Sequence, residues 1–266
     1  MATSATGGRL YLCGTIHILR ESDYPLAPAY EAAYADAQKL VFELPPGSGK
    51  GGDMNAQMQK LAALPRGTSI EDIIGKEMAA TVFTWAGKHR IPTASVSGYQ
   101  PWYVALMIAA VEYGELGAQP DKGVDSYFEN RAAHDKKPGE GLETVDFQIG
   151  LFSKLSARQQ KDLLQQTLEE VKTVPEEFSK LIKAWKEGDL AALHEMLFRE
   201  AEQYPDLMDI FLLDRNKAWI ERLDAFLKKG ERVMLLVGTG HLTGSQGLIE
   251  LLKAKGYQVE RYKSAN

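Results

Sequence analysis

Residues 10–17 read LYLCGTIH, and the pattern returns at residues 233–241 as VMLLVGTGH. In both copies a short apolar run is followed by a glycine, two further residues and a histidine. Apolar runs of this length, rich in Leu, Val and Tyr and bounded by glycine, predict strands buried on both faces. The two histidines, His17 and His241, should then follow the carboxyl ends of two strands, where open α/β sheets bind ligands.

Each copy begins a larger unit of strand, helix and strand. After the first copy, residues 29–38 are alanine-rich and predict a helix, and residues 39–44, KLVFEL, predict a strand with Glu43 near its end. After the second copy, residues 246–255 predict a helix and residues 258–262 a last strand. We therefore expect an α/β fold with a mixed, mainly parallel sheet built from two related strand–GxxH–helix–strand units.

The segment between these units is expected to be mostly helical. A short strand is predicted at residues 92–97, whereas residues 145–229 show helical spacing of Leu, Ile, Phe and Trp almost throughout. We expect residues 9–144 and 230–263 to form the two halves of the α/β core. Residues 145–229 would be a large helical insertion that forms a cleft or lid, within one compact structural unit.

Composition excludes several classes of protein. The chain has 266 residues, a formal net charge of -5 and no stripe of Lys and Arg, so we expect no nucleic-acid partner. No apolar run reaches the roughly 18 residues of a membrane helix, and the first residues, MATSATGGRL, do not form a signal peptide. A soluble protein is expected, either periplasmic or secreted with its signal peptide absent from this sequence, or cytoplasmic. The single cysteine, Cys13, lies in the first strand and is expected to be a core thiol.

His17, Glu43 and His241 follow three predicted parallel strands and would converge if those strands are neighbours. Imidazole and carboxylate groups are suitable ligands for Zn, Mn, Fe or Co. The alternative is that each histidine bonds a loop and that Glu43 is a solvated charge. Two copies of the motif, and a carboxylate that follows an apolar run and needs a partner, favour a metal site. The other histidines, at positions 89, 134 and 194, are expected on solvated faces.

Further candidates lie outside the two motifs. Glu143 stands in GLET, at an expected strand end, and is either a site residue or a charge at a helix start. Arg215 stands in DRN after an apolar helical patch, and could hold an oxyanion or form a structural ion pair. Asp125 and Tyr127 are weaker candidates for the cleft.

Taken together, GTIH, FEL, GLETVDFQ, DRN and VGTGHLTG with GLIELLKAKGYQVERY resemble the TraB/GumN family over residues 10–262. That family is similar to the Tiki metalloproteases and, more distantly, to erythromycin esterases and ChaN-like proteins. The resemblance implies a hydrolase, specifically a peptidase, that depends on a divalent metal ion (Mn, Co, Zn or Fe). It implies metal ligands at His17, Glu43 and His241, and catalytic-cleft residues at Glu43, Glu143, Arg215 and Asn216. Many relatives have GAGH where this chain has GTGH, and Thr239 fits that position.

The sequence thus predicts a metal-dependent hydrolase acting on a peptide or a small molecule. Glu43 would be either a metal ligand or a general base, Arg215 would stabilise the oxyanion, and Glu143 would transfer protons. One alternative is a metal-independent esterase in which Glu43 orients His17 as the base. Others are a protein that binds a ligand such as haem and a regulatory protein without catalysis. The metal, the substrate and the oligomeric state stay open.

Overall fold

The structure is a computed structural model that describes residues 1–48, 52–199 and 203–263. Its contacts divide the chain into two compact units. The first contains Met1–Gly47, Leu116–Thr144 and Pro175–Asn266, and the second contains Ser48–Glu115 and Val145–Val174.

A six-stranded sheet forms the centre of the first unit, with the strand order β4-β3-β5-β2-β1-β6. The strands are β1 (Ala2–Thr3), β2 (Arg9–Thr15), β3 (Lys39–Phe42), β4 (Gly139–Gly141), β5 (Arg232–Gly238) and β6 (Gln258–Val259). β5 is parallel to both β2 and β3, and β3 is parallel to β4, whereas β1 is antiparallel to β2 and β6. The expected α/β class with a mixed, mainly parallel sheet is confirmed.

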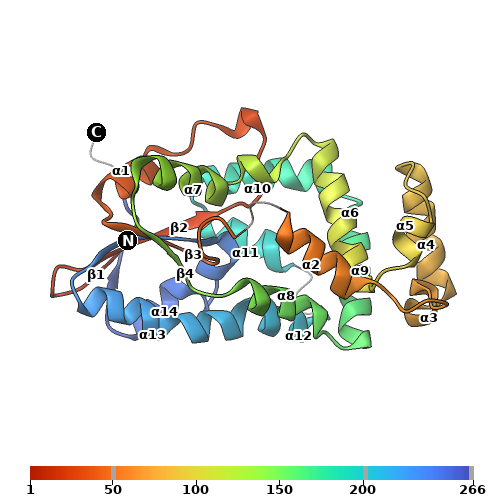
Figure 1. The fold of residues 1–266 in the computed structure, drawn as a ribbon. Helices are drawn as coiled ribbons and strands as arrows, with labels where there is room; N and C mark the ends of the chain where they lie inside the picture. Colours follow the sequence, from red (N-terminus) through yellow and green to blue (C-terminus); the bar gives the residue numbers. More distant parts are fainter. Residues whose placement is uncertain (49–51, 200–202, 264–266) are drawn as a thin grey trace. The chain divides into compact units, whose positions relative to one another are not determined.

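Helices on both faces of the sheet explain why its central strands are apolar throughout. On one face α13 (Asp214–Lys228) and α14 (Leu248–Ala254) pack against Leu10, Val41 and Leu235. Alternate residues such as Leu40 and Met234 are also fully buried and face the opposite side. There α1 (Pro28–Asp36) and α7 (Val124–Asp135) cover the sheet (Figure 1).

The other elements of the first unit are short or peripheral to the sheet. They are η1 (Glu21–Asp23), η2 (Pro120–Lys122), α10 (Val174–Glu187), α11 (Leu190–Phe198), α12 (Pro205–Met208), the π-helical turn η4 (Asp209–Leu213) and η5 (Thr239–Leu242). β1 was not expected from the sequence, because two residues give no periodicity to read. β6 is shorter than the strand expected at 258–262, since only two of its residues pair with β1.

The second unit is helical in its described part. Its helices are α2 (Asp53–Ala62), α3 (Ile70–Ile74), α4 (Lys76–Lys88), α5 (Ala94–Ser97), α6 (Pro101–Glu115), α8 (Val145–Ser153) and α9 (Ala157–Glu170). Side chains from α3, α4, α6 and α9 share one apolar core, which includes Val82, Ile108 and Leu164. The strand predicted at residues 92–97 is wrong. This segment forms the short helix α5. Val96 is the only buried residue of that helix and packs in this helical core, so the segment lacks the alternating burial of a strand.

The helical character expected for residues 145–229 is confirmed in the part of this range that the structure describes, 145–199 and 203–229, by α8 to α13. The units nevertheless divide these helices differently from the boundaries expected from sequence. Residues 145–174 belong with residues 48–115, because α9 packs on α6 and α8 packs on α2. Contacts between helices distant in the chain cause this grouping, and local periodicity does not encode them. Within the described residues no helix has the length and apolar character needed to cross a membrane.

Candidate metal and catalytic site

Three neighbouring parallel strands end at the same edge of the sheet and carry the predicted ligands. The register places Thr15 of β2 opposite Gly238 of β5, and Phe42 of β3 opposite Leu236. His17 therefore follows β2, Glu43 follows β3, and His241 lies in η5 directly after β5. β5 lies between β2 and β3, so the three side chains start from adjacent positions along this edge.

The three side chains surround Gly238, although their ligand atoms do not all lie within 4.8 Å of one another. A methyl group placed on Gly238 would lie 3.3 Å from Glu43 Oε1, 3.4 Å from His17 Nε2 and 3.7 Å from His241 Cδ2. The Gly238 N–H donates to Glu43 Oε1 at 2.7 Å, and His241 Nε2 lies 3.7 Å from the same oxygen. Glycine at this position leaves the space between the two imidazoles and the carboxylate open.

Asn216 and Arg215 fix the tautomer of His241, which is 1% exposed. The Asn216 amide donates to the carbonyl oxygens of His241 and Gln246, which orients its Oδ1 toward His241 Nδ1 at 2.7 Å. Arg215 Nη1 lies 3.1 Å from His241 Nε2 and can only donate, so Nε2 accepts and Nδ1 carries the proton. Burial lowers the pKa of His241 to about 3, so its imidazole is neutral at neutral pH.

Arg215 binds both carboxylates of the site. Its Nε and Nη2 each donate to Glu143 at 2.9 Å, and Nη2 also donates to Glu43 Oε2 at 2.5 Å. Nη1 donates to the carbonyl oxygen of Phe211 at 2.9 Å. All three side chains are largely buried, with exposed fractions of 9% for Arg215, 11% for Glu43 and 6% for Glu143. The guanidinium thus compensates two buried negative charges.

The charges around Glu43 and His17 set their protonation states. Burial alone would raise the pKa of Glu43, but the surrounding histidines, Arg215 and the Gly238 N–H together lower it to about 2. Glu43 is therefore ionised at neutral pH. The Asp125 carboxylate, 2.8 Å from Nδ1 of His17, raises the pKa of that imidazole to about 9, and the His17 side chain is 63% exposed. In the absence of an ion His17 is therefore protonated at neutral pH.

The structure brings together all the predicted site residues and adds others. Trp219 donates from Nε1 to Glu143 Oε1 at 2.9 Å, and its ring centroid lies 4.4 Å from that of His241. Its position three and four residues after Asn216 and Arg215 on α13 was the signal that could have identified it. The Phe211 carbonyl belongs to the π-helical turn η4, a feature common at functional sites. Sequence reasoning gave no sign of this turn.

The remaining histidines have different environments. The solvated position expected for His134 is correct, since its side chain is 88% exposed. His194 is partly buried and lies 3.3 Å from Thr243 Oγ1. The solvated position expected for His89 is wrong, because its side chain is 3% exposed and lies between Glu112 and Glu115. Glu112 and Glu115 lie on another helix, α6, so the residues next to His89 in the sequence gave no sign of these contacts.

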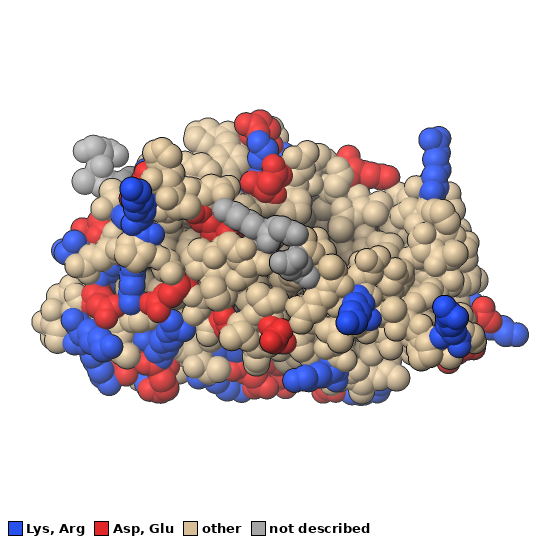
Figure 2. Space-filling model, in the orientation of Figure 1, with Lys and Arg blue, Asp and Glu red and all other residues tan. Residues whose placement is uncertain are grey.

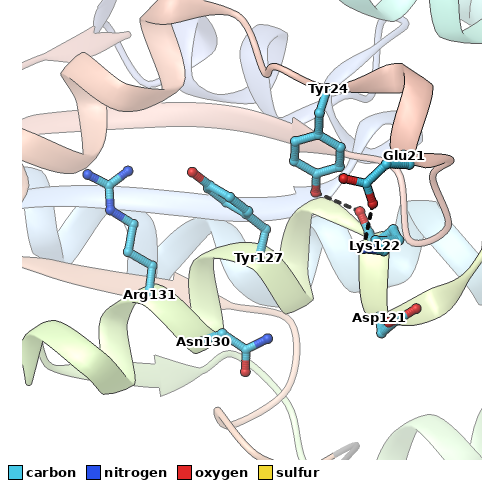
Figure 3. Close-up of a pocket in the computed structure, with 7 residues that line it drawn as sticks. All are labelled: Glu21, Tyr24, Asp121, Lys122, Tyr127, Asn130 and Arg131. Atoms are coloured by element: carbon cyan, nitrogen blue, oxygen red, sulfur yellow. Dashed lines mark hydrogen bonds and ion pairs between the residues drawn. The ribbon is translucent and has the colours of Figure 1, made fainter.

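A separate pocket of about 440 Å³ lies in the same unit and contains none of the predicted metal ligands (Figure 3). It is lined by Glu21, Tyr24, Asp121, Lys122, Tyr127, Asn130 and Arg131. Tyr127, a weaker candidate for the cleft, lines this pocket, and its hydroxyl donates to Glu31. Asp125 on the same helix contacts His17 instead.

On the face shown in Figure 2, Lys and Arg side chains are interspersed with Asp and Glu.

The single cysteine, Cys13, is 8% exposed, and burial raises the pKa of its thiol to about 12. A thiol in that state is a poor nucleophile at neutral pH.

The sequence model of the TraB/PrgY/gumN family matches residues 2–261. Among curated proteins, the chain is 22% identical to the metalloprotease TIKI1 of Danio rerio, over 94% of this chain and 60% of that protein. It is 22% identical to the metalloprotease TIKI2 of Xenopus tropicalis, over 94% of this chain and 57% of that protein. It is 24% identical to YbaP of Escherichia coli, over 91% of this chain and 87% of that protein.

The chain therefore spans about 60% of the length of its Tiki relatives. No solved structure gave a significant match to it.

Proposed function

Because this chain belongs to the TraB/PrgY/gumN family, we propose that it is a divalent-metal-dependent hydrolase that cleaves peptide bonds. The observation that carries this proposal is the approach of His17 Nε2, Glu43 Oε1 and the His241 ring to one point beside Gly238. Two imidazoles, that of His17 after release of its Nε2 proton, and one ionised carboxylate form a donor set that suits Zn²⁺, Mn²⁺, Co²⁺ or Fe²⁺. The relatives named as metalloproteases support the same class of reaction.

The site residues have the hydrogen bonds that metal-binding histidines usually require. Such histidines donate from the nitrogen that does not bind the ion to a carboxylate or carbonyl group, which fixes the ring. Asp125 accepts from His17 Nδ1, and the amide oxygen of Asn216 accepts from His241 Nδ1. Both Nε2 atoms are thereby directed away from these partners. For His241 Nε2 to bind an ion, its hydrogen bond from Arg215 Nη1 must break. The guanidinium would then still be held by the Phe211 carbonyl group and the two carboxylates.

His17, Glu43 and His241 would hold the divalent ion, which when bound would supply Lewis-acid activation of water and of a scissile carbonyl group. Glu43 either binds the ion or accepts the proton of the attacking water. Arg215 holds Glu43 in its ionised state and stabilises negative charge that develops beside it. Glu143 accepts hydrogen bonds from both Arg215 and Trp219, so in the state described it positions the guanidinium.

The contact between His17 and Asp125 also supports a second candidate, a metal-independent hydrolase. A carboxylate 2.8 Å from Nδ1 orients His17, as in a His–Asp pair, and the imidazole would act as a general base in the fraction of molecules in which it is deprotonated. The structure thus offers Asp125, in place of Glu43, as the residue that orients this base. Hydrolysis that persists after chelation and dialysis would support the second candidate and contradict the first.

The decisive experiment measures peptidase turnover and metal content on the same preparations of His17→Ala, His241→Ala and Glu43→Gln. Each histidine variant should lose one equivalent of metal while its far-UV circular dichroism stays nearly unchanged. His134→Ala, which removes a histidine whose side chain is 88% exposed, is the matched control. Full metal occupancy in both site variants would contradict the proposal.

Glu43→Gln separates the two roles of Glu43. If the carboxylate is the general base, turnover should fall by about 10²-fold or more while metal is retained. If it is a ligand, metal affinity should fall as well. Full turnover with full metal would remove Glu43 from the site.

A further inference from the structure

A second group of metal-ligand side chains lies in the helical unit, and it shares no residue with the site above. His89 follows the C-terminal end of α4, and Glu112 and Glu115 lie one turn apart on α6. One ligand atom from each of these three residues lies within 4.8 Å of the other two. Among the described residues, no other trio of His, Cys, Asp and Glu meets this criterion.

We propose that His89 Nε2 and Glu112 bind a divalent metal ion in a second site, of the type that takes Zn²⁺ or Co²⁺, and that Glu115 orients the imidazole from Nδ1. The imidazole of His89 lies between the two carboxylates: Nδ1 is 2.8 Å from Glu115 Oε1, and Nε2 is 3.1 Å from Glu112 Oε1. The side chains of His89 and Glu112 are 3% and 13% exposed, so the contact between them is shielded from solvent, whereas Glu115 is exposed.

The contact at Nε2 does not have the geometry of a hydrogen bond. This nitrogen is buried and has no hydrogen-bond partner, although a carboxylate oxygen lies 3.1 Å away. The oxygen is therefore displaced from the axis along which an N–H group would point. Two ligands held about 2.0–2.2 Å from one tetrahedral ion lie roughly 3.3–3.6 Å apart, with the second ligand off that axis. A cation shared by Nε2 and Glu112 accounts for the displacement and requires the two atoms to separate by a few tenths of an ångström.

Trp85 supports this arrangement from α4. Its Nε1 donates to Glu112 Oε1 at 2.7 Å, and its ring centroid lies 4.9 Å from that of His89. Partners of this kind orient metal ligands, and their loss commonly weakens binding by about 10–100-fold. The ion would connect the end of α4 to α6 and stabilise the helical unit.

Access and local charge allow binding from solvent. Glu115 is 60% exposed, and Glu112 lines a surface pocket of about 460 Å³. Lys88 and Lys172 line the same pocket and oppose a cation. The two carboxylates of the cluster must therefore provide the attraction, which makes Glu115 the informative position to neutralise.

The experiment uses the full chain carrying His17→Ala and His241→Ala, so that the site at the sheet edge cannot bind. Co²⁺ is titrated while tryptophan fluorescence is followed, since a paramagnetic ion beside Trp85 quenches its emission. We expect one saturable equivalent of Co²⁺ in this background. Adding Glu115→Gln should weaken binding by more than about tenfold, and adding His89→Gln should abolish it. Glu115→Gln changes an exposed side chain and should fold, whereas His134→Gln is the control for histidine loss.

The outcomes separate this inference from the proposed function. Equal Co²⁺ binding with and without Glu115→Gln and His89→Gln would overturn the inference, as would a folded background that binds no Co²⁺. If the otherwise unchanged chain binds one equivalent that His89→Gln removes and His17→Ala does not, the second site stands and the proposed function fails.

Discussion

The amide oxygen of Asn216 lies 2.7 Å from Nδ1 of His241, and this contact determines which nitrogen of the histidine faces the site. The same amide donates to two backbone carbonyl groups, so it cannot rotate without breaking both bonds. Asn216 of α13 thereby fixes the tautomer and the orientation of His241, which follows β5.

Removing this amide should release the His241 ring. We expect Asn216→Ala to weaken metal binding by about 10–100-fold and to lower the free energy of unfolding by about 1–3 kcal/mol, because two buried carbonyl groups lose their donor. Asn216→Asp keeps the acceptor for Nδ1 but loses both donors. Metal titration and urea unfolding of both variants test this prediction, with the exposed Asn130→Ala as the control. Unchanged metal affinity in Asn216→Ala would show that the contact does not orient the ligand.

Filling the space above Gly238 should block the site without unfolding the protein. The φ of Gly238 is -48°, which an alanine adopts without strain. Its methyl group would, however, lie 3.3 Å from Glu43 Oε1 and 3.4 Å from His17 Nε2. We expect Gly238→Ala to retain its circular dichroism spectrum while metal affinity and turnover fall at least about tenfold. Gly98→Ala, whose methyl group would have no neighbour closer than 3.8 Å, is the control. Normal turnover in Gly238→Ala would place the reacting groups elsewhere.

Asp23 should stabilise the fold in a way that depends on pH. Burial opposes its ionisation, but the side chain and backbone N–H of Arg20 hydrogen-bond the carboxylate and lower the pKa of Asp23. A lowered pKa means that the stabilisation is complete above the unfolded pKa of about 3.9. It is lost as the pH falls through the folded pKa.

We therefore expect Asp23→Asn to reduce the free energy of unfolding by about 1.5–3 kcal/mol at pH 7 and by less at pH 3. Urea unfolding at the two pH values measures the difference, and the exposed Asp121→Asn is the control. A loss of the same size at both pH values would contradict the assigned ion pair.

The sequence alone determined the local parts of this protein. Continuous apolar runs indicated β2, β3 and β5, because strands covered on both faces leave no polar alternation. The paired GxxH motifs placed His17 and His241 directly after two of these strands. The DRN motif singled out Arg215 and Asn216, although not the partners that they bind.

The tertiary structure alone decided which of these parts meet. Strand order places β5 between β2 and β3, and this brings Glu43 to the N–H of Gly238. Helix packing places Arg215 between Glu43 and Glu143, and brings His89 between Glu112 and Glu115. The physical reason is that periodicity along a chain encodes burial and local hydrogen bonding. Contacts between distant residues depend instead on strand order and helix packing, which a single sequence does not specify.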